Sequence, residues 1–147
     1  MPVPFPPLFA AALVGLPVRC RGGRLGRATD LLVDLQRWRA IGFIVECGDH
    51  AERFLPFAAS QPAAHEVVVG SPLMLLDEPA FYRARAVSFV ALRGAGIARE
   101  RRHAGLLADL VIARTGEVDE LEIDVDGLRR RIPADGSRVS PSTATAA

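Results

Sequence analysis

A repeat of short motifs about 80 residues apart constrains the fold of this chain more than any other feature. The first occurrence contains Leu13, Gly15, Val18, Gly26 and Asp30, and the second contains Leu92, Gly94, Ile97, Gly105 and Asp109. Each residue of the second set follows its counterpart by 79 positions, as 109 minus 30 shows. Because one offset relates glycines, an acid and apolar residues, the pattern indicates a duplicated structural unit.

The first occurrence has the alternation of half-buried β-strands. Apolar and polar residues alternate over 16–20, 27–35 and 38–47, and a shorter strand is expected at 53–57, where Pro56 favours an edge or a strand end. Gly22-Gly23 is expected to supply the positive dihedral angles of a tight hairpin. We expect Thr29 to share the inward face with Leu31 and Val33.

The second occurrence predicts a similar series of strands. These are expected at 108–112, 121–126 and 128–133, with Ala108 on the inward face and Asp126-Gly127 as a hairpin turn. Arg101 and Arg102 occupy the positions of Gly22 and Gly23, so a tight first hairpin is not predicted there. We expect one buried core formed by Val18, Leu31, Val33, Phe43, Val45, Ile97, Leu110, Ile112, Leu121 and Ile123.

Composition and charge favour a folded, cytoplasmic protein. The chain has 147 residues, half of them hydrophobic, and a net charge of +1, so no global field attracts it to nucleic acid or an acidic membrane. All 18 basic residues are arginine, a bias that we attribute to a GC-rich bacterial genome. Cys20 and Cys47 lie in strand-like segments and are expected to be buried thiols rather than a disulfide.

The pattern divides the chain into five parts. We expect an extended N-terminal arm at 1–12, a first β unit at 13–70, a bridge at 71–91, a second β unit at 92–139 and a disordered tail at 140–147. In the bridge, helical spacing from Asp77 to Leu92 predicts one short helix that packs between the units. The apolar stretch from Leu8 to Val18 contains Gly15 and Pro17 and is too short to span a membrane.

The combined frame resembles the PRC-barrel family. This frame is Leu-x-Gly-x-x-Val, a turn, Gly-x-x-x-Asp-Leu-x-Val, an apolar strand and an edge strand with proline. The family takes its name from the cytoplasmic part of the photosynthetic reaction-centre H subunit and from the C-terminal domain of the ribosome-maturation factor RimM. The resemblance implies two tandem, small and highly curved antiparallel β-barrels, arranged as a pseudo-symmetric pair or a homodimer of such pairs. The matching residues Gly15, Gly26, Asp30, Gly94, Gly105 and Asp109 are expected to be structural.

No catalytic or metal-binding motif is recognised. His50, His65 and His103 lack metal-ligand spacing, and neither cysteine lies in a nucleophile motif. The acidic residues between 117 and 126 suggest either a cation site or a solvated strand face. We favour the strand face, paired with the arginines at 129–131. The chain is therefore expected to be neither an enzyme nor a cofactor-binding protein.

One concentration of arginine is not obviously neutralised in the sequence. It contains the candidate partner-binding residues Arg83, Arg85, Arg99, Arg101 and Arg102. It is either an ordinary solvated rim or a docking site for an acidic protein, a phosphate backbone or a headgroup surface. The favoured function is a protein-interaction or adaptor module. The alternative is a factor that binds RNA or ribosomal protein in RNA processing or ribosome assembly.

Overall fold

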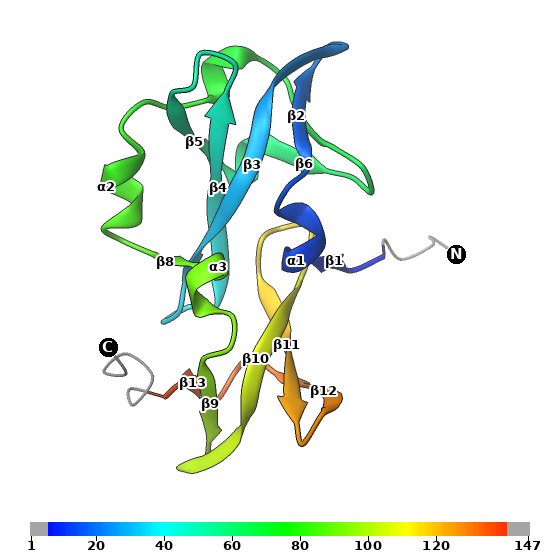
Figure 1. Cartoon of the computed structure of the whole chain (residues 1–147), viewed down its shortest axis with the longest axis vertical. Helices are drawn as coiled ribbons and strands as arrows, with labels where there is room; N and C mark the ends of the chain where they lie inside the picture. The colour runs from blue at the N-terminus through cyan, green and yellow to red at the C-terminus, as the bar shows by residue number, and fades with distance from the viewer. Residues whose placement is uncertain (1–5, 141–147) are drawn as a thin grey trace.

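The computed structural model of the chain describes residues 6–140 (Figure 1). The strands are β1 (Leu8–Phe9), β2 (Pro17–Cys20), β3 (Gly23–Asp34), β4 (Arg39–Cys47), β5 (Glu52–Pro56), β6 (Ser60–Pro62), β7 (Val67–Val69), β8 (Val87–Ser88), β9 (Gly96–Arg99), β10 (Arg102–Ile112), β11 (Val118–Val125), β12 (Leu128–Pro133) and β13 (Ser137–Val139). The helices are α1 (Ala10–Leu13), α2 (Pro79–Arg83) and α3 (Phe89–Leu92), with 3-10 turns η1 (Phe57–Ala59) and η2 (Pro72–Met74). The described chain is thus mainly β, as expected.

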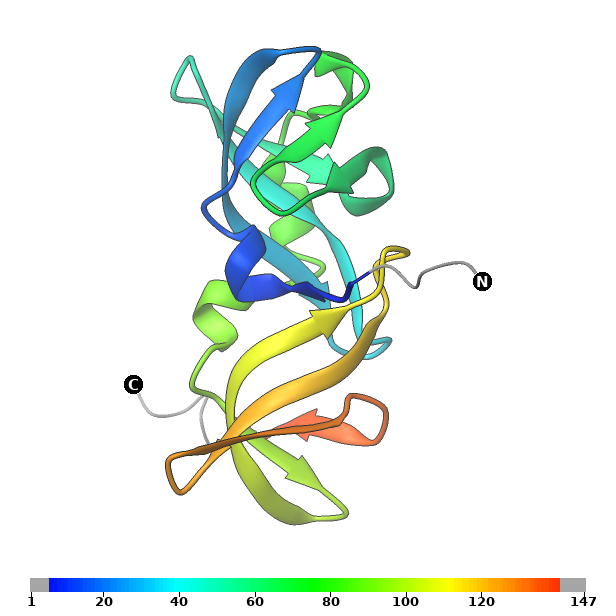
Figure 2. The ribbon, with the colours of Figure 1, turned by 90° about the vertical axis from the view of Figure 1, so that its right-hand side faces the viewer.

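The strands form two curled sheets, one from each half of the chain (Figures 1 and 2). Sheet 1 has the order β5-β4-β3-β2-β7-β6, and β8 pairs with β3. Sheet 2 has the order β12-β11-β10-β9-β13, and β1 pairs with β10. Among the strands of residues 6–140, all pairs are antiparallel except β2 with β7, which is parallel. Strand β7 lies between β2 and β6.

The two sheets have corresponding registers. In sheet 1 a β-bulge separates the pairs of Ala28 and Asp30, and in sheet 2 one separates the pairs of Leu107 and Asp109. A bulge adds a residue to one strand and shifts the alternation of faces beyond it. Ala28 and Leu107 therefore take the inward positions that the sequence pattern assigned to Thr29 and Ala108.

Two glycines allow the strands to cross closely. A Cβ atom on Gly26 would lie 2.3 Å from the carbonyl oxygen of Glu46, and one on Gly105 would lie 2.7 Å from the carbonyl oxygen of Asp124. Any side chain at either position would displace the neighbouring backbone. The repeated glycine is thus required by the crossing of β3 with β4 and of β10 with β11.

The leading strand of each half pairs with the long strand of the other half. Leu8 and Phe9 in β1 pair with Ile112 and Val111 in β10. In the same way, β8 pairs with Val33 and Leu32 in β3. Figures 1 and 2 show the short helices that follow these strands, α1 and α3, between the two sheets. The halves therefore complete one another's sheets, an exchange that the sequence did not predict.

The junction between the halves is also joined by the turns after β3 and β10. Ala40 donates to the carbonyl of Gly116, Val118 donates to that of Trp38, and the Arg39 guanidinium lies 3.2 Å from the Glu117 carboxylate. The Trp38 indole N–H donates to the carbonyl oxygen of Ser137. One hydrophobic cluster includes residues of both sheets, and all ten residues expected in the core are buried in it. That prediction is confirmed.

The bridge and the arm differ from their expected forms. Instead of one helix between Asp77 and Leu92, the chain forms α2 and α3 with strand β8 between them. Ser88 has extended dihedral angles because it pairs with β3, and its hydroxyl accepts from the N–H of Ala91 as the cap of α3. The expected extended arm includes β1, but residues 10–12 lie in helix α1. Residues 1–5 of the arm and 141–147 of the expected tail lie outside the described residues, whereas Ser140, the first residue of that tail, donates its N–H to the carbonyl of Gly96.

Both first hairpins are tight, although the sequence did not predict the second. In the first, Cys20 pairs with Gly23 around Arg21 and Gly22, whose φ angles are 45° and 80°. In the second, Arg99 pairs with Arg102 around Glu100 and Arg101, whose φ angles are 50° and 66°. The turn residues are therefore one position earlier than expected, and three charged residues, Arg21, Glu100 and Arg101, adopt the left-handed conformation. The Asp126-Gly127 turn, with φ angles of 51° and 83°, is confirmed.

Candidate functional site

The repeated aspartates link the two halves of the chain. The Asp109 carboxylate accepts from the backbone N–H groups of Ala11 in α1, at 2.9 Å, and of Leu110, at 2.8 Å. Asp30 accepts in the corresponding way from Val90 in α3, at 3.1 Å, and from Leu31, at 2.8 Å. Each aspartate thus binds the first turn of the helix that leads into the other half.

The surroundings of Asp109 disfavour its ionised form. Only 7% of the residue is exposed, and burial raises the pKa of its carboxyl above the ordinary value of 3.8, against the opposing effect of the two N–H donors. Asp30 has a further partner, because the Ser88 hydroxyl donates to its second carboxylate oxygen. Both carboxylates are thus engaged by donors within the chain.

Three of the five candidate arginines are held by contacts within the chain. The guanidinium of Arg99 donates to the carbonyl oxygens of Pro133 and Asp135 and to the hydroxyl of Ser137, at 2.8–2.9 Å. It thus fixes the loop between β12 and β13. The Arg99 guanidinium is therefore already engaged within the chain.

Arg83 and Arg85 are also engaged, both around helix α2. Arg83 forms two hydrogen bonds to the Glu52 carboxylate, at 3.0 and 3.1 Å, which lower the pKa of Glu52. Arg85 donates to the carbonyl oxygen of Phe81 and lies 3.6 Å from the centre of its ring. The five candidate arginines between Arg83 and Arg102 are therefore not one set of unpaired side chains.

Arg101 and Arg102 remain as the unpaired part of the candidate set. Both are exposed at the β9–β10 hairpin, and within residues 6–140 neither side chain has a hydrogen-bond or ion-pair partner. Arg101 lines a surface groove of about 390 Å³ with Ala98, Glu100, Gly136 and Arg138. Arg138, which no sequence pattern indicated, lies 37 positions away (138 minus 101) and enters the groove only through the pairing of β13 with β9.

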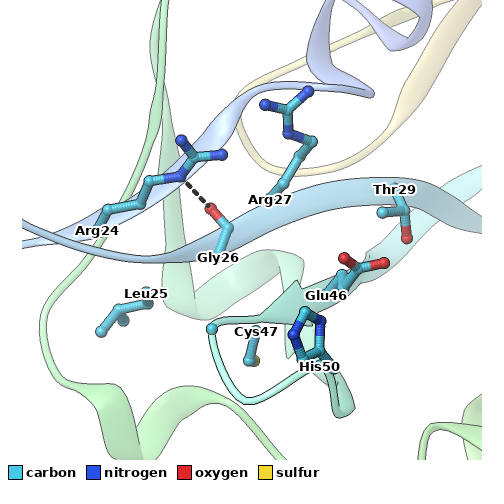
Figure 3. Close-up of a pocket in the computed structure, with 9 residues that line it drawn as sticks. Arg24, Leu25, Gly26, Arg27, Thr29, Glu46, Cys47 and His50 are labelled. Carbon is cyan, nitrogen blue, oxygen red and sulfur yellow. Dashed lines mark hydrogen bonds between the residues drawn. The ribbon is translucent and has the colours of Figure 1, made fainter.

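A second groove lies over β3 and β4 in sheet 1 (Figure 3). It has a volume of about 570 Å³, and Figure 3 shows Arg24 and Arg27 on one side of β3 and Glu46, Cys47 and His50 on the other. Residues three positions apart in a regular strand lie on opposite faces. Arg24 and Arg27 share a face because the register with β2 shifts between them, which makes Leu25 an extra residue in β3. This shift depends on strand pairing, so sequence spacing alone could not show the groove.

The second groove lacks the geometry of a reactive centre. The Cys47 thiol is directed to the carbonyl oxygen of Val45, at 3.8 Å, and Arg24 makes only a long bond of 3.5 Å to the carbonyl of Gly26. Within residues 6–140, no side-chain hydrogen bond joins Cys47, His50 and Glu46 as a nucleophile, a base and an orienting group. Both cysteines are free thiols, with Cys47 buried and Cys20 only partly buried.

The acidic strand face has the pairing expected from the sequence. Arg129 contacts the carboxylates of Glu122 and Asp124 at 2.9 and 3.0 Å, and Arg131 lies 3.7 Å from Glu122. Across the part of the chain that is described, no three or more metal-ligating side chains gather into a candidate metal site. Among the same residues no helix has the length and apolar character needed to cross a bilayer.

No protein-family model matches the chain, and no curated protein is significantly similar to it.

Proposed function

We propose that this chain is a non-enzymatic, cytoplasmic adaptor made of two PRC-type β units that arose by internal duplication. The corresponding bulges, crossings and aspartate bonds of the two sheets support the duplication. The PRC-type assignment is supported by the curled antiparallel sheets and by the motif residues at the positions that require them. The shared core is filled with apolar side chains, which favours binding on the outer surface rather than in an internal cavity.

The arginine surface at the β9–β10 hairpin is the observation that supports this function best. It consists of the exposed Arg101 and Arg138, which line one groove with Glu100, together with the exposed Arg102 at the same hairpin, outside that groove. Arginine side chains without internal partners can donate paired hydrogen bonds to carboxylates of a partner. We therefore propose an acidic protein as the partner and this arginine surface as its docking site.

A charge-reversal experiment tests the proposed function. The chain is used as bait in the native cell extract, and recovered proteins are quantified for the wild type and for the variant Arg101→Glu/Arg102→Glu. We expect the variant to recover at least about tenfold less of the specific partner than the wild type does, because both contacts become repulsive. The purified partner should show the same loss in a direct titration.

The first hairpin supplies a matched control. Arg21→Glu/Arg24→Glu introduces the same charge change at the β2–β3 hairpin, and recovery should remain close to that of the wild type. Equal recovery by wild type and the Arg101/Arg102 variant would contradict the proposed docking site. Loss of recovery after ribonuclease treatment would instead favour the alternative of RNA binding.

A further inference from the structure

The outer edge of sheet 1 is extended by a segment of the bridge. Phe54 in the edge strand β5 donates to the carbonyl of Leu76 at 2.8 Å and accepts from its N–H at 2.7 Å. The pair forms an isolated antiparallel bridge. The adjacent Asp77 carboxylate lies 3.3 Å from the guanidinium of Arg53. A short apolar-acidic segment therefore occupies this edge through backbone bonds and one ion pair.

Strand β12 holds the corresponding position in sheet 2. Phe54 lies opposite Ile44 in β4, and Arg131 lies opposite Glu122 in β11, which is the counterpart of Ile44. Phe54 directs its backbone N–H and carbonyl away from β4, toward Leu76. Arg131 has the same register position in sheet 2, so its backbone N–H and carbonyl point away from β11 in the same way. Among the described residues, no backbone bond from another segment reaches Arg129 or Arg131. The edge that is occupied in sheet 1 is therefore open in sheet 2.

The side chains of this edge match the charge of an acidic segment. Arg130 is the register counterpart of Arg53, and unlike Arg53 it has no ion-pair or hydrogen-bond partner within residues 6–140. On the same face as Arg130, the strand carries Leu128, which is 71% exposed, and the partly buried Ile132. One face of the edge thus presents an apolar, a basic and an apolar side chain in succession.

We propose that the edge of β12 binds an extended acidic segment of a partner protein by antiparallel strand addition. The segment has an apolar residue opposite Ile132, an acidic residue opposite Arg130 and an apolar residue opposite Leu128, with one residue between each. The intervening residues form the backbone bonds to Arg131 and Arg129, as Leu76 does to Phe54.

A second copy of this chain does not fit the edge. Antiparallel pairing of β12 with another β12 would place a run of three arginines against an identical run. Like charges on directly opposed strands are destabilising. An acidic segment avoids this repulsion, and its ion pair with Arg130 repeats the contact that Asp77 makes with Arg53. This surface is separate in residues from the Arg101, Arg102 and Arg138 surface, so the two proposals can fail independently.

A labelled peptide tests the proposal on the full chain. The peptide contains Leu-Thr-Asp-Thr-Leu between serines, has blocked ends, and is titrated by fluorescence anisotropy. We expect saturable binding that weakens about three- to fivefold when its aspartate is replaced by asparagine, the range of a partly exposed ion pair. The variant Arg130→Glu should weaken binding at least about tenfold and should bind better when the peptide aspartate is replaced by arginine.

Two controls separate strand addition from nonspecific charge attraction. Arg37→Glu makes the same charge change at another exposed arginine without a side-chain partner among the described residues, and it should leave binding unchanged. N-methylation of the first threonine, which faces Arg131, should abolish binding because it removes a backbone donor. No saturable signal up to about 1 mM peptide, or equal binding by the methylated peptide, would overturn the proposal.

Discussion

Asp109 shows how one buried side chain joins distant parts of the sequence. Its carboxylate accepts from Ala11, 98 positions away, and from Leu110 with the same oxygen. Burial of the charged group opposes the benefit of these bonds. The residue therefore stabilises the junction between the halves, although its burial disfavours the ionised form of its carboxyl group.

Replacing Asp109 by asparagine should change how stability depends on pH. The pKa of Asp109 is raised in the folded state, so the folded chain binds this proton more tightly than the unfolded chain does. The stabilisation that comes from this tighter proton binding is complete at pH values below the ordinary pKa of 3.8. It is lost as the pH rises through the raised pKa of the folded state. Asp109→Asn keeps an oxygen acceptor and has no such loss, so its stability relative to wild type should increase from acidic to neutral pH.

Denaturant unfolding at several pH values measures this difference. Parallel stability curves for wild type and Asp109→Asn would show that the carboxyl does not titrate as proposed. As a second comparison, Asp109→Ala removes the acceptor altogether and should destabilise the chain by about 1–3 kcal/mol, because two N–H donors lose their partner.

At the scale of single elements, the β9–β10 hairpin stores backbone strain. Arg101 has a φ angle of 66°, whereas the corresponding residue of the first hairpin is Gly22. Arg101→Gly should therefore stabilise the chain by about 0.5–1 kcal/mol, since glycine adopts this conformation without steric cost. Chemical denaturation measures the change. Replacement of Gly22 by alanine should have the opposite sign, and a loss of stability in Arg101→Gly would contradict the strain.

The sequence predicted most strands but not how the elements meet. Alternation of apolar residues identified β3, β4 and β11 because each has an inward face. Both bulges were missed because their extra residues, Thr29 and Ala108, are visible only in the strand pairing. The helical spacing from Asp77 to Leu92 is interrupted by β8, whose conformation depends on its pairing with β3. Long-range pairing thus overrides local periodicity in these segments.

The candidate site was predictable to a similar extent. The sequence indicated Arg101 and Arg102 because they replace glycines at a turn. It could not separate them from Arg99, whose partners lie 34 to 38 positions later in the chain. Arg138 and the edge of β12 likewise become part of a surface only once the register of sheet 2 is known. Spacing therefore identifies residue types, whereas pairing decides which of them are already engaged.

For the whole molecule, the exchange of β1 and β8 makes each sheet dependent on the other half. Neither half keeps its complete sheet alone, since β10 would lose β1 and β3 would lose β8. The hydrophobic cluster also includes residues from both sheets, so separating the halves would expose them to water. The two sheets are therefore expected to unfold together rather than as independent domains.

This expectation can be tested with two spectroscopic probes. Trp38 is the only tryptophan, and its indole N–H bonds to Ser137 in the other half, so its fluorescence reports on the junction. Far-ultraviolet circular dichroism reports on both sheets. We expect coincident denaturation curves from the two probes, as in a two-state transition.

Core truncations in each half extend the test. Leu31→Ala in sheet 1 and Leu110→Ala in sheet 2 should each destabilise the chain by about 2–5 kcal/mol, because both side chains are fully buried. Each variant should shift both probes by the same amount, since damage to one sheet is transmitted through the exchanged strands. A variant whose circular dichroism shows two transitions, with one at the wild-type midpoint, would instead mean that one sheet survives without the other.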